Sequence, residues 1–184
     1  MYWCNRYHFK TLFISAVFAS GLLSCKPDVH VTEAGKRYFD LKQFINADSA
    51  RLNKLAPLVL KAVQHNSEKS QTLRVTIKNW GEELALFSAS DINKPAWRDS
   101  YQILQQGDSV IYTALYPELV TRRMVISKNG EAVKKIVVDN FTKNLLYQTK
   151  EHLVYYPDSL YLIDKEQKVK LIGVNRYRIA GKIK

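Results

Sequence analysis

Residues 37–55 carry apolar side chains at the spacing of one helix face. Asp48 falls near this face and fits an unbroken helix less well than its neighbours do. Pro57 lacks a backbone N–H and disfavours helical geometry at the residue before it. The pattern therefore predicts an amphipathic helix that ends at Ala56. Its apolar face consists of Tyr38, Leu41, Phe44, Ile45, Leu52 and Leu55.

After Pro57 the pattern changes to that of short elements separated by turns. Residues 58–63 form an apolar run whose period is ambiguous, and apolar and polar residues alternate over 73–77 as in a half-buried strand. A short helix is expected over 81–89, with Leu84 and Phe87 facing inward. The chain then returns to strand after a polar loop that contains Pro95.

The rest of the chain predicts strands joined by local turns. Asn129-Gly130 is a strong hairpin signal, because both residues of such a turn take positive φ. Local turns between eight to ten short strands favour an antiparallel meander over βαβ units. One helix and one large sheet can each bury a face only against the other. We therefore expect an α+β fold, in which the N-terminal helix packs on a large curved antiparallel β-meander that curls as far as a half-barrel. Strands are expected over residues 100–105, 109–116, 120–128, 131–141, 145–156, 159–163, 168–174 and 176–183.

Residues 1–23 have the composition of an export signal. The first ten residues include Arg6 and Lys10 and no acid, and residues 11–23 form one short apolar run. A helix that crosses a bilayer needs roughly 20 apolar residues. A cationic start, a short apolar segment and small residues at its end indicate secretion. Anchoring by an uncleaved segment is the alternative.

The apolar run ends in Leu22-Leu23-Ser24-Cys25, which resembles the lipobox of bacterial lipoproteins. In that family a leucine stands three residues before the cysteine and a small residue stands directly before it. Leu22 and Ser24 match this pattern, whereas Leu23 is bulkier than is common at its position. The resemblance implies cleavage between Ser24 and Cys25 and a diacylglyceryl thioether on Cys25. An incidental or buried cysteine is the alternative interpretation.

Acylation of Cys25 would fix the protein at a membrane. Each CH₂ group of an acyl chain that enters the bilayer contributes about 0.8 kcal/mol to membrane binding. One chain therefore binds a protein to the membrane only marginally, whereas two chains anchor it stably. No Asp follows Cys25 directly, and this resembles lipoproteins that are forwarded to the outer membrane. We therefore expect an outer-membrane lipoprotein that faces the periplasm. The expected organisation is a signal peptide at 1–24, a lipidated tether at 25–36 and one α+β domain at 37–184.

The chain lacks the local motifs of catalysis and cofactor binding. His30, His65 and His152 stand alone, outside the spacings of metal ligands. Scattered glycines form no phosphate-binding loop, and no G-x-S-x-G elbow is present. With Cys4 removed in the signal and Cys25 acylated, no thiol remains for catalysis. We expect a protein that is not an enzyme and that carries no cofactor and no metal.

Positive charge is concentrated at the C-terminus. The formal net charge is +11, and over residues 165–184 seven basic residues face Glu166 alone. Nucleic acid is the usual partner of such a patch, but export makes it an unsuitable one. Anionic lipid headgroups or an acidic protein are the remaining partners, and a solvated edge protected by its lysines is the alternative. The candidate basic patch consists of Lys165, Lys168, Lys170, Arg176, Arg178, Lys182 and Lys184.

Tyrosines recur on the expected strands. A concave sheet lined with them could hold an acyl chain or a peptide, because tyrosine joins apolar area to a polar tip. Cross-strand packing with the hydroxyl at the surface is the alternative. The tyrosines in question are Tyr112, Tyr116, Tyr147, Tyr155, Tyr156, Tyr161 and Tyr177.

Three segments resemble small uncharacterised envelope lipoproteins of the Bacteroidetes: Tyr38-Phe39-Asp40-Leu41, residues 91–95 and residues 142–147. This resemblance implies a lipid-anchored envelope protein and brings no catalytic residues. The outline of one helix and a meander is also similar to the lipoprotein-carrier family, as a fold-level analogy only. We expect a non-enzymatic binding or scaffold module that engages an envelope protein. The alternative is a carrier that holds lipid or acyl chains in a cavity of the curved sheet.

Overall fold

The computed structural model describes residues 37–184, which belong to one compact unit. The expected signal peptide, the cleavage site at Ser24 and Cys25 and the lipidated tether lie outside the described residues. The helices are α2 (Leu41–Leu55), α3 (Trp80–Glu83), α4 (Ala85–Ala89) and the 3₁₀ turn η2 (Pro95–Trp97). The strands are β1 (Leu58–His65), β2 (Gln71–Thr76), β3 (Tyr101–Gln106), β4 (Ser109–Ala114), β5 (Thr121–Asn129), β6 (Ala132–Lys143), β7 (Tyr147–Tyr156), β8 (Leu160–Val169) and β9 (Gly173–Ile183).

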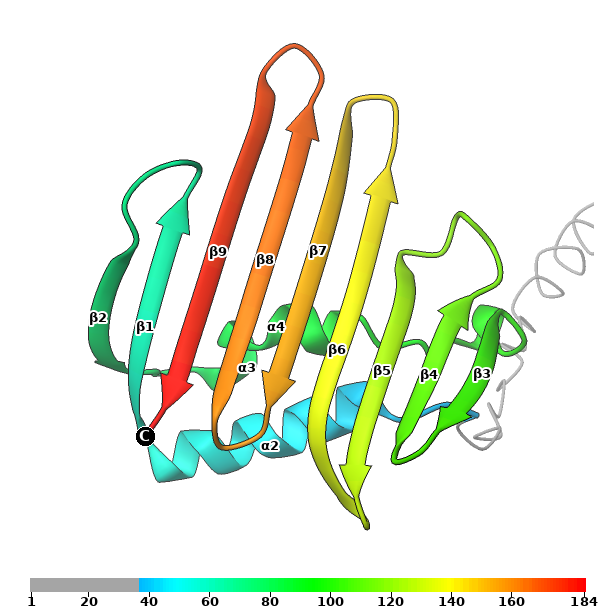
Figure 1. Ribbon diagram of the computed structural model, residues 1–184, viewed down its shortest axis with the longest axis horizontal. Helices are drawn as coiled ribbons and strands as arrows, with labels where there is room; N and C mark the ends of the chain where they lie inside the picture. The colour runs from blue at the N-terminus through cyan, green and yellow to red at the C-terminus, as the bar shows by residue number, and fades with distance from the viewer. Residues whose placement is uncertain (1–36) are drawn as a thin grey trace, which may run out of the picture. The chain divides into compact units, whose positions relative to one another are not determined.

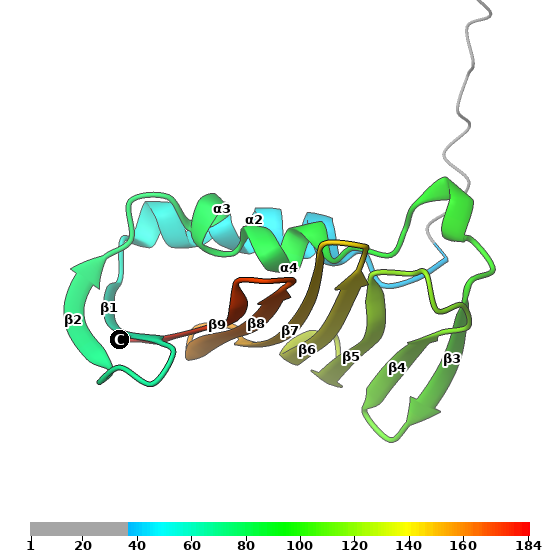
Figure 2. The same cartoon turned by 90° about the horizontal axis from the view of Figure 1, so that it is seen from above.

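All nine strands form one antiparallel sheet, in the order β2-β1-β9-β8-β7-β6-β5-β4-β3. Strands β3 to β9 follow one another as a meander, and the β1–β2 hairpin joins the sheet beside β9 (Figure 1). The helices lie together on one face of the curved sheet (Figure 2). The expected α+β class is therefore confirmed. The sheet remains open, with β2 and β3 at its edges, and does not close into a barrel.

Helix α2 ends where the sequence predicts, but it begins only at Leu41, so Tyr38, which was expected on its apolar face, lies before the helix. The Asp40 carboxylate caps its N-terminus by accepting from the backbone N–H of Gln43 at 3.0 Å. Ala56 closes the helix in a left-handed conformation and donates its N–H to the carbonyl of Leu52 at 2.9 Å. Leu55 was expected on the apolar face, but it is exposed in the last turn of α2.

Asp48 lies within the buried face of α2 without breaking the helix. Its carboxylate accepts a hydrogen bond from the hydroxyl of Tyr155 on β7 and another from Arg51 Nε at 2.7 Å. Arg51 also pairs with Asp158 in the β7–β8 turn at 2.6 Å. Burial, and then the hydrogen bond to Asp48, raise the pKa of the Tyr155 hydroxyl. The Asp48–Tyr155 hydrogen bond therefore joins α2 to the sheet. From periodicity alone, Asp48 is only an acidic residue on an apolar face.

Two strand predictions are wrong at the C-terminal end of the chain. Residues 159–183 were expected to form three strands, but they form only β8 and β9. The expected break near residues 164–167 is continuous strand, because its charged side chains find cross-strand partners instead of ending the ladder. The turn falls at 170–172, where Leu171 and Gly173 both take positive φ.

The core lies between the helices and the sheet, and both expected inward residues of the short helices, Leu84 and Phe87, are fully buried. Successive strand residues alternate between faces, so each strand contributes every second side chain to this layer. The largest fully buried side chains are Trp80, Tyr155, Tyr161, Phe87, Leu41, Ile45, Leu52, Leu84, Ile92, Met124, Ile126 and Ile136.

Candidate functional site

Large side chains fill the space between the sheet and the helices. A carrier of lipid or acyl chains would need a cavity in this space. The ring of Tyr161 lies against Trp80 in an edge-on contact, and its hydroxyl donates to Glu83 Oε1 at 2.6 Å. Lys61 pairs with the same carboxylate at 2.7 Å. Burial, and then the bond to Glu83, raise the pKa of Tyr161. Tyr112, Tyr155 and Tyr161 are thus packing residues, which supports the cross-strand interpretation for these three positions.

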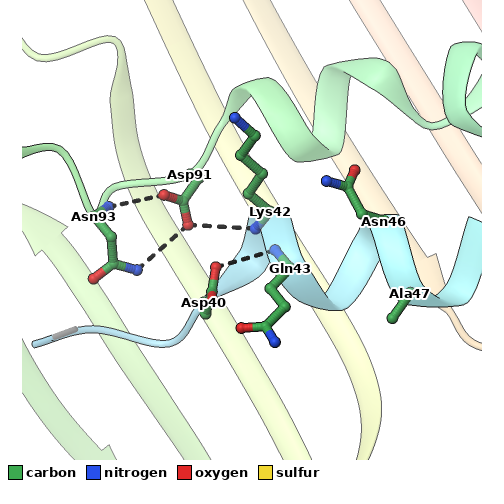
Figure 3. A pocket seen from close by; sticks show the side chains of 7 residues that line it. All are labelled: Asp40, Lys42, Gln43, Asn46, Ala47, Asp91 and Asn93. Carbon is green, nitrogen blue, oxygen red and sulfur yellow. Dashed lines mark hydrogen bonds between the residues drawn. The ribbon is translucent and has the colours of Figure 1, made fainter. Parts of the chain in front are cut away.

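An open surface hollow of about 710 Å³ lies at the N-terminus of α2 (Figure 3). Its polar groups hold the helix end in place. Asp91 Oδ1 accepts from the backbone N–H of Leu41 at 3.1 Å and from Asn93 Nδ2 at 3.4 Å. Asn93 Nδ2 in turn donates to the carbonyl of Phe39 at 3.0 Å. The hollow is lined by residues that serve the start of α2, and its arrangement indicates a structural role.

The opposite face of the sheet is uncovered by any described element, and we call it the open face (Figure 2). A row of apolar side chains runs across the strands on the open face. Val125, Val137, Val154 and Leu162 each stand between two buried neighbours in their strand, so their side chains point to the open face. The registers align them with residues of four further strands. The apolar row consists of Ala62, Ala180, Leu162, Val154, Val137, Val125, Ile111 and Leu104.

A second row, two residues further along each strand, is charged. Arg178 donates to Asp164 at 3.0 Å, and His152 lies 2.6 Å from the carboxylate of Asp139. The registers place Asp164 opposite His152, and Asp139 opposite Arg123 at 3.9 Å. Aspartates therefore alternate with arginine or histidine side chains along this charged row. The row comprises Arg178, Asp164, His152, Asp139 and Arg123.

A hollow of about 350 Å³ lies over the charged row and takes in His152 and both of its neighbouring aspartates. The hollow is open, and the His152 and Asp139 side chains on it are about half exposed. No cluster of histidine, cysteine and acidic side chains suited to a metal ion occurs among residues 37–184. His152 lies between Asp139 and Asp164 as one member of the charged row on the open face.

The candidate basic patch is divided by the alternation of strand faces. Lys165 points to the helix-bearing side and pairs with Glu151 at 2.9 Å. Arg176 and Arg178 lie on the open face and pair with Glu166 at 2.7 Å and with Asp164, respectively.

The four remaining lysines of the patch lie at both ends of the sheet. Lys168 and Lys170 lie at the β8–β9 turn, and Lys182 and Lys184 lie at the end of β9. The seven side chains therefore do not gather in one place, and acids near in space balance three of them.

The apolar row carries a sequence signal that the strand-by-strand analysis did not use. Strands β5 to β8 each hold three consecutive apolar residues around their row residue, as in Ile136-Val137-Val138, instead of a strict alternation. Such triplets put an apolar side chain on both faces of the sheet. The other three triplets are Met124-Val125-Ile126, Leu153-Val154-Tyr155 and Tyr161-Leu162-Ile163.

Comparisons with protein-family models, with curated proteins and with solved structures found no match to this chain. Among the described residues, no helix has the length and apolar character needed to cross a bilayer.

Proposed function

We propose that this chain is a lipid-anchored envelope protein that binds another protein without catalysing a reaction. Cys25 supplies the anchor, and the open face of the sheet supplies the binding surface. The observation that carries the proposal is the apolar row, in which eight cross-strand neighbours line up on a face that no described element covers.

The dimensions of the row suit a protein partner. Eight strands at about 4.8 Å spacing give a row about 34 Å long. A strip of that length and about 20 Å wide approaches the roughly 800 Å² that each partner buries in a standard interface. Small ligands are held instead in concave pockets that enclose most of their surface. The partner is therefore expected to present a broad, flat surface.

The charged row supplies the border that such an interface needs. Protein interfaces have an apolar centre and a polar rim, in which charges fix orientation more than they add affinity. Here the pairs Arg178–Asp164 and Arg176–Glu166 border the apolar row along one side. On its other side Lys135 lies over the ring of Tyr156 on the same face. The partner is expected to carry a complementary, alternating pattern of charges.

Site-specific photo-crosslinking in the source cells tests the binding surface. A photoreactive residue is placed in the full-length chain at Val154, in the apolar row, or at Glu82, an exposed position on the helix-bearing side. We expect one discrete product from Val154 and none from Glu82. The same product from both positions would show that the open face has no special role.

A substitution in the row provides the matched control. Val137→Glu puts a charge beside Val154 in the register, and it should remove the crosslinked product. Ala50→Glu adds the same charge at an exposed position of α2, on the helix-bearing side of the sheet, and should leave the product unchanged. Circular dichroism establishes that both variants fold. A product that persists in folded Val137→Glu contradicts the proposal.

The anchor is tested separately. Labelling with radioactive palmitate should mark the wild-type chain and should fail on Cys25→Ser, which should also accumulate as the uncleaved form. If the wild-type chain takes up no label, the acylated part of the proposal is wrong. The crosslinking result would still stand on its own.

A further inference from the structure

Two neighbouring hairpin ends expose four aliphatic side chains. Leu145 and Leu146 form the β6–β7 turn with exposures of 91% and 69%, while Leu171 is fully exposed and Ile172 is 85% exposed in the β8–β9 turn. The Lys170 N–H donates to the Leu146 carbonyl at 2.9 Å, so the two turns lie side by side. Both project beyond the helices (Figure 1). We call these four residues the aliphatic tip.

The fold itself does not require an aliphatic residue at Leu171. Its φ of 72° lies in the left-handed region, which glycine and asparagine adopt at little cost and leucine does not. Its side chain is fully exposed, so no burial offsets this strain. The neighbouring turn is held firmly, because Asn144 Oδ1 accepts from the N–H groups of Leu146 and Tyr147, each at 2.9 Å. A strained, exposed aliphatic residue on an ordered turn points to a role outside folding.

The two turns and the strand residues that run from them carry charges of a single sign, as far as the cross-strand pair Lys150 and Glu166. Residues 142–150 and 167–175 include four lysines and no acid. Lysine ammonium groups beside exposed aliphatic side chains match a bilayer surface, since the apolar groups enter the acyl boundary while the cations meet headgroup phosphates. The lysines are Lys143, Lys150, Lys168 and Lys170.

The opposite end of the sheet shows the contrasting pattern. Its three hairpin turns each carry an acid, namely Asp108, Glu131 and Asp158. None of the exposed large hydrophobic residues in the described chain lies in these turns. These three turns therefore lack the exposed aliphatic side chains of the aliphatic tip and each add a negative charge.

We propose that the aliphatic tip inserts into the surface of a phospholipid bilayer that contains anionic lipid, with the four lysines on the headgroup phosphates. The contact rests on residues 142–150 and 167–175 and does not depend on acylation of Cys25. It provides a second membrane attachment, which would orient the domain with its strands pointing at the bilayer.

A local fluorescence probe tests the insertion. In the full-length chain with Cys4→Ser and Cys25→Ser, a single cysteine at Leu145 or at Ser159 in the opposite β7–β8 turn carries an environment-sensitive nitrobenzoxadiazole label. Vesicles of phosphatidylethanolamine and phosphatidylglycerol are expected to shift the emission of the Leu145 label to the blue, and brominated lipids should quench it. The Ser159 label should stay in water.

Substitutions in the tip separate its two contributions. Leu171→Asp with Ile172→Asp, read by the Leu145 label, should weaken apparent vesicle affinity at least about tenfold, because removing one large aliphatic side chain from water contributes about that factor. Lys168→Ala with Lys170→Ala should weaken it about fivefold per lysine, and only with anionic vesicles. Leu55→Asp removes another exposed leucine, at the end of α2, and should leave vesicle affinity unchanged.

Three outcomes would overturn the proposal. The Leu145 label could be unaffected by vesicles, both labels could respond equally, or the aspartate pair could leave the response intact. A Leu145 label that ignores vesicles but is shielded by purified envelope proteins would assign the aliphatic tip to a protein partner instead. None of these results bears on crosslinking from the open face, so the two proposals fail separately.

Discussion

Gly181 on β9 lies directly opposite Tyr161 on β8, and the tyrosine ring covers the glycine so closely that a Cβ at this position would overlap the ring carbons. Tyr161 cannot easily move aside, because it is fully buried and its hydroxyl is bonded to Glu83. The absence of a side chain at one strand position thus allows a large aromatic residue to close the core.

Gly181→Ala is therefore expected to destabilise the domain by about 1–3 kcal/mol, the usual range for overpacking a filled core. Urea unfolding followed by circular dichroism measures the change. In a Tyr161→Ala background the same substitution should cost much less, because the overlapping ring is gone. Equal costs in the two backgrounds would show that the contact does not limit packing.

The Asp48–Tyr155 hydrogen bond should contribute to the free energy of unfolding at neutral pH. Tyr155→Phe leaves a buried carboxylate with one donor fewer, and we expect a loss of about 1–3 kcal/mol in unfolding free energy. With Asp48→Leu already present, the added cost of Tyr155→Phe should shrink, since no carboxylate remains to be satisfied. Additive costs in this double-mutant cycle would contradict the coupling.

Alkaline pH should unfold the domain through its buried tyrosines. Burial raises the pKa of Tyr101, Tyr155 and Tyr161 above the ordinary value of 10.0. Below that value the phenols are neutral in both states, and their contribution to stability is fully present. Above it the unfolded chain loses protons that the folded chain keeps, so stability falls as the pH rises.

Urea unfolding at a series of pH values measures this dependence. The unfolding free energy should fall steadily as the pH rises above about 10, the ordinary tyrosine pKa. Tyr101→Phe with Tyr161→Phe should flatten the fall, because two of the four phenols whose pKa burial raises, which also include Tyr112 and Tyr155, no longer titrate. An unchanged slope in that variant would exclude these phenols as its cause.

Leu171→Asn should have opposite effects on stability and on vesicle binding. Asparagine tolerates positive φ, so the substitution should stabilise the fold by about 1 kcal/mol. It also removes one aliphatic side chain from the tip and should weaken vesicle binding. Leu171→Ala keeps the backbone strain and loses the same side chain, so it should weaken binding without stabilising the fold. Thermal unfolding and the Leu145 label measure the two effects.

Periodicity and turn chemistry predicted the elements whose causes are local. The end of helix α2 follows from apolar spacing and Pro57. The β5–β6 turn falls one residue later than Asn129-Gly130 predicts, at Gly130-Glu131, because Asn129 stays in β5 and Gly130, but not Asn129, takes a positive φ. These local patterns could not predict contacts between residues that are far apart in the sequence. The burial of Asp48 depends on Tyr155, and the pairing of β1 with β9 depends on residues at the two ends of the domain.

The candidate surfaces were less accessible to sequence analysis than the fold. Counting charge along residues 165–184 joined side chains that strand alternation places on opposite faces, such as Lys165 and Arg178. The apolar row becomes visible only when the seven strand registers that join its residues are known, although each apolar triplet hints at it. The aliphatic tip required knowledge of which leucines remain uncovered, and that is a property of the assembled sheet.

The pairing of β1 with β9 also determines when the sheet can be completed. Val59, near the start of β1, lies opposite Ile183 at the end of β9, so the first and the last strand of the described domain are neighbours in the sheet. Until β9 is in place, the β1–β2 hairpin has no neighbour to dock on, and one edge of β1 stays unpaired. The sheet is therefore completed by a contact between residues that are far apart in the sequence, and nonlocal pairing of this kind slows folding.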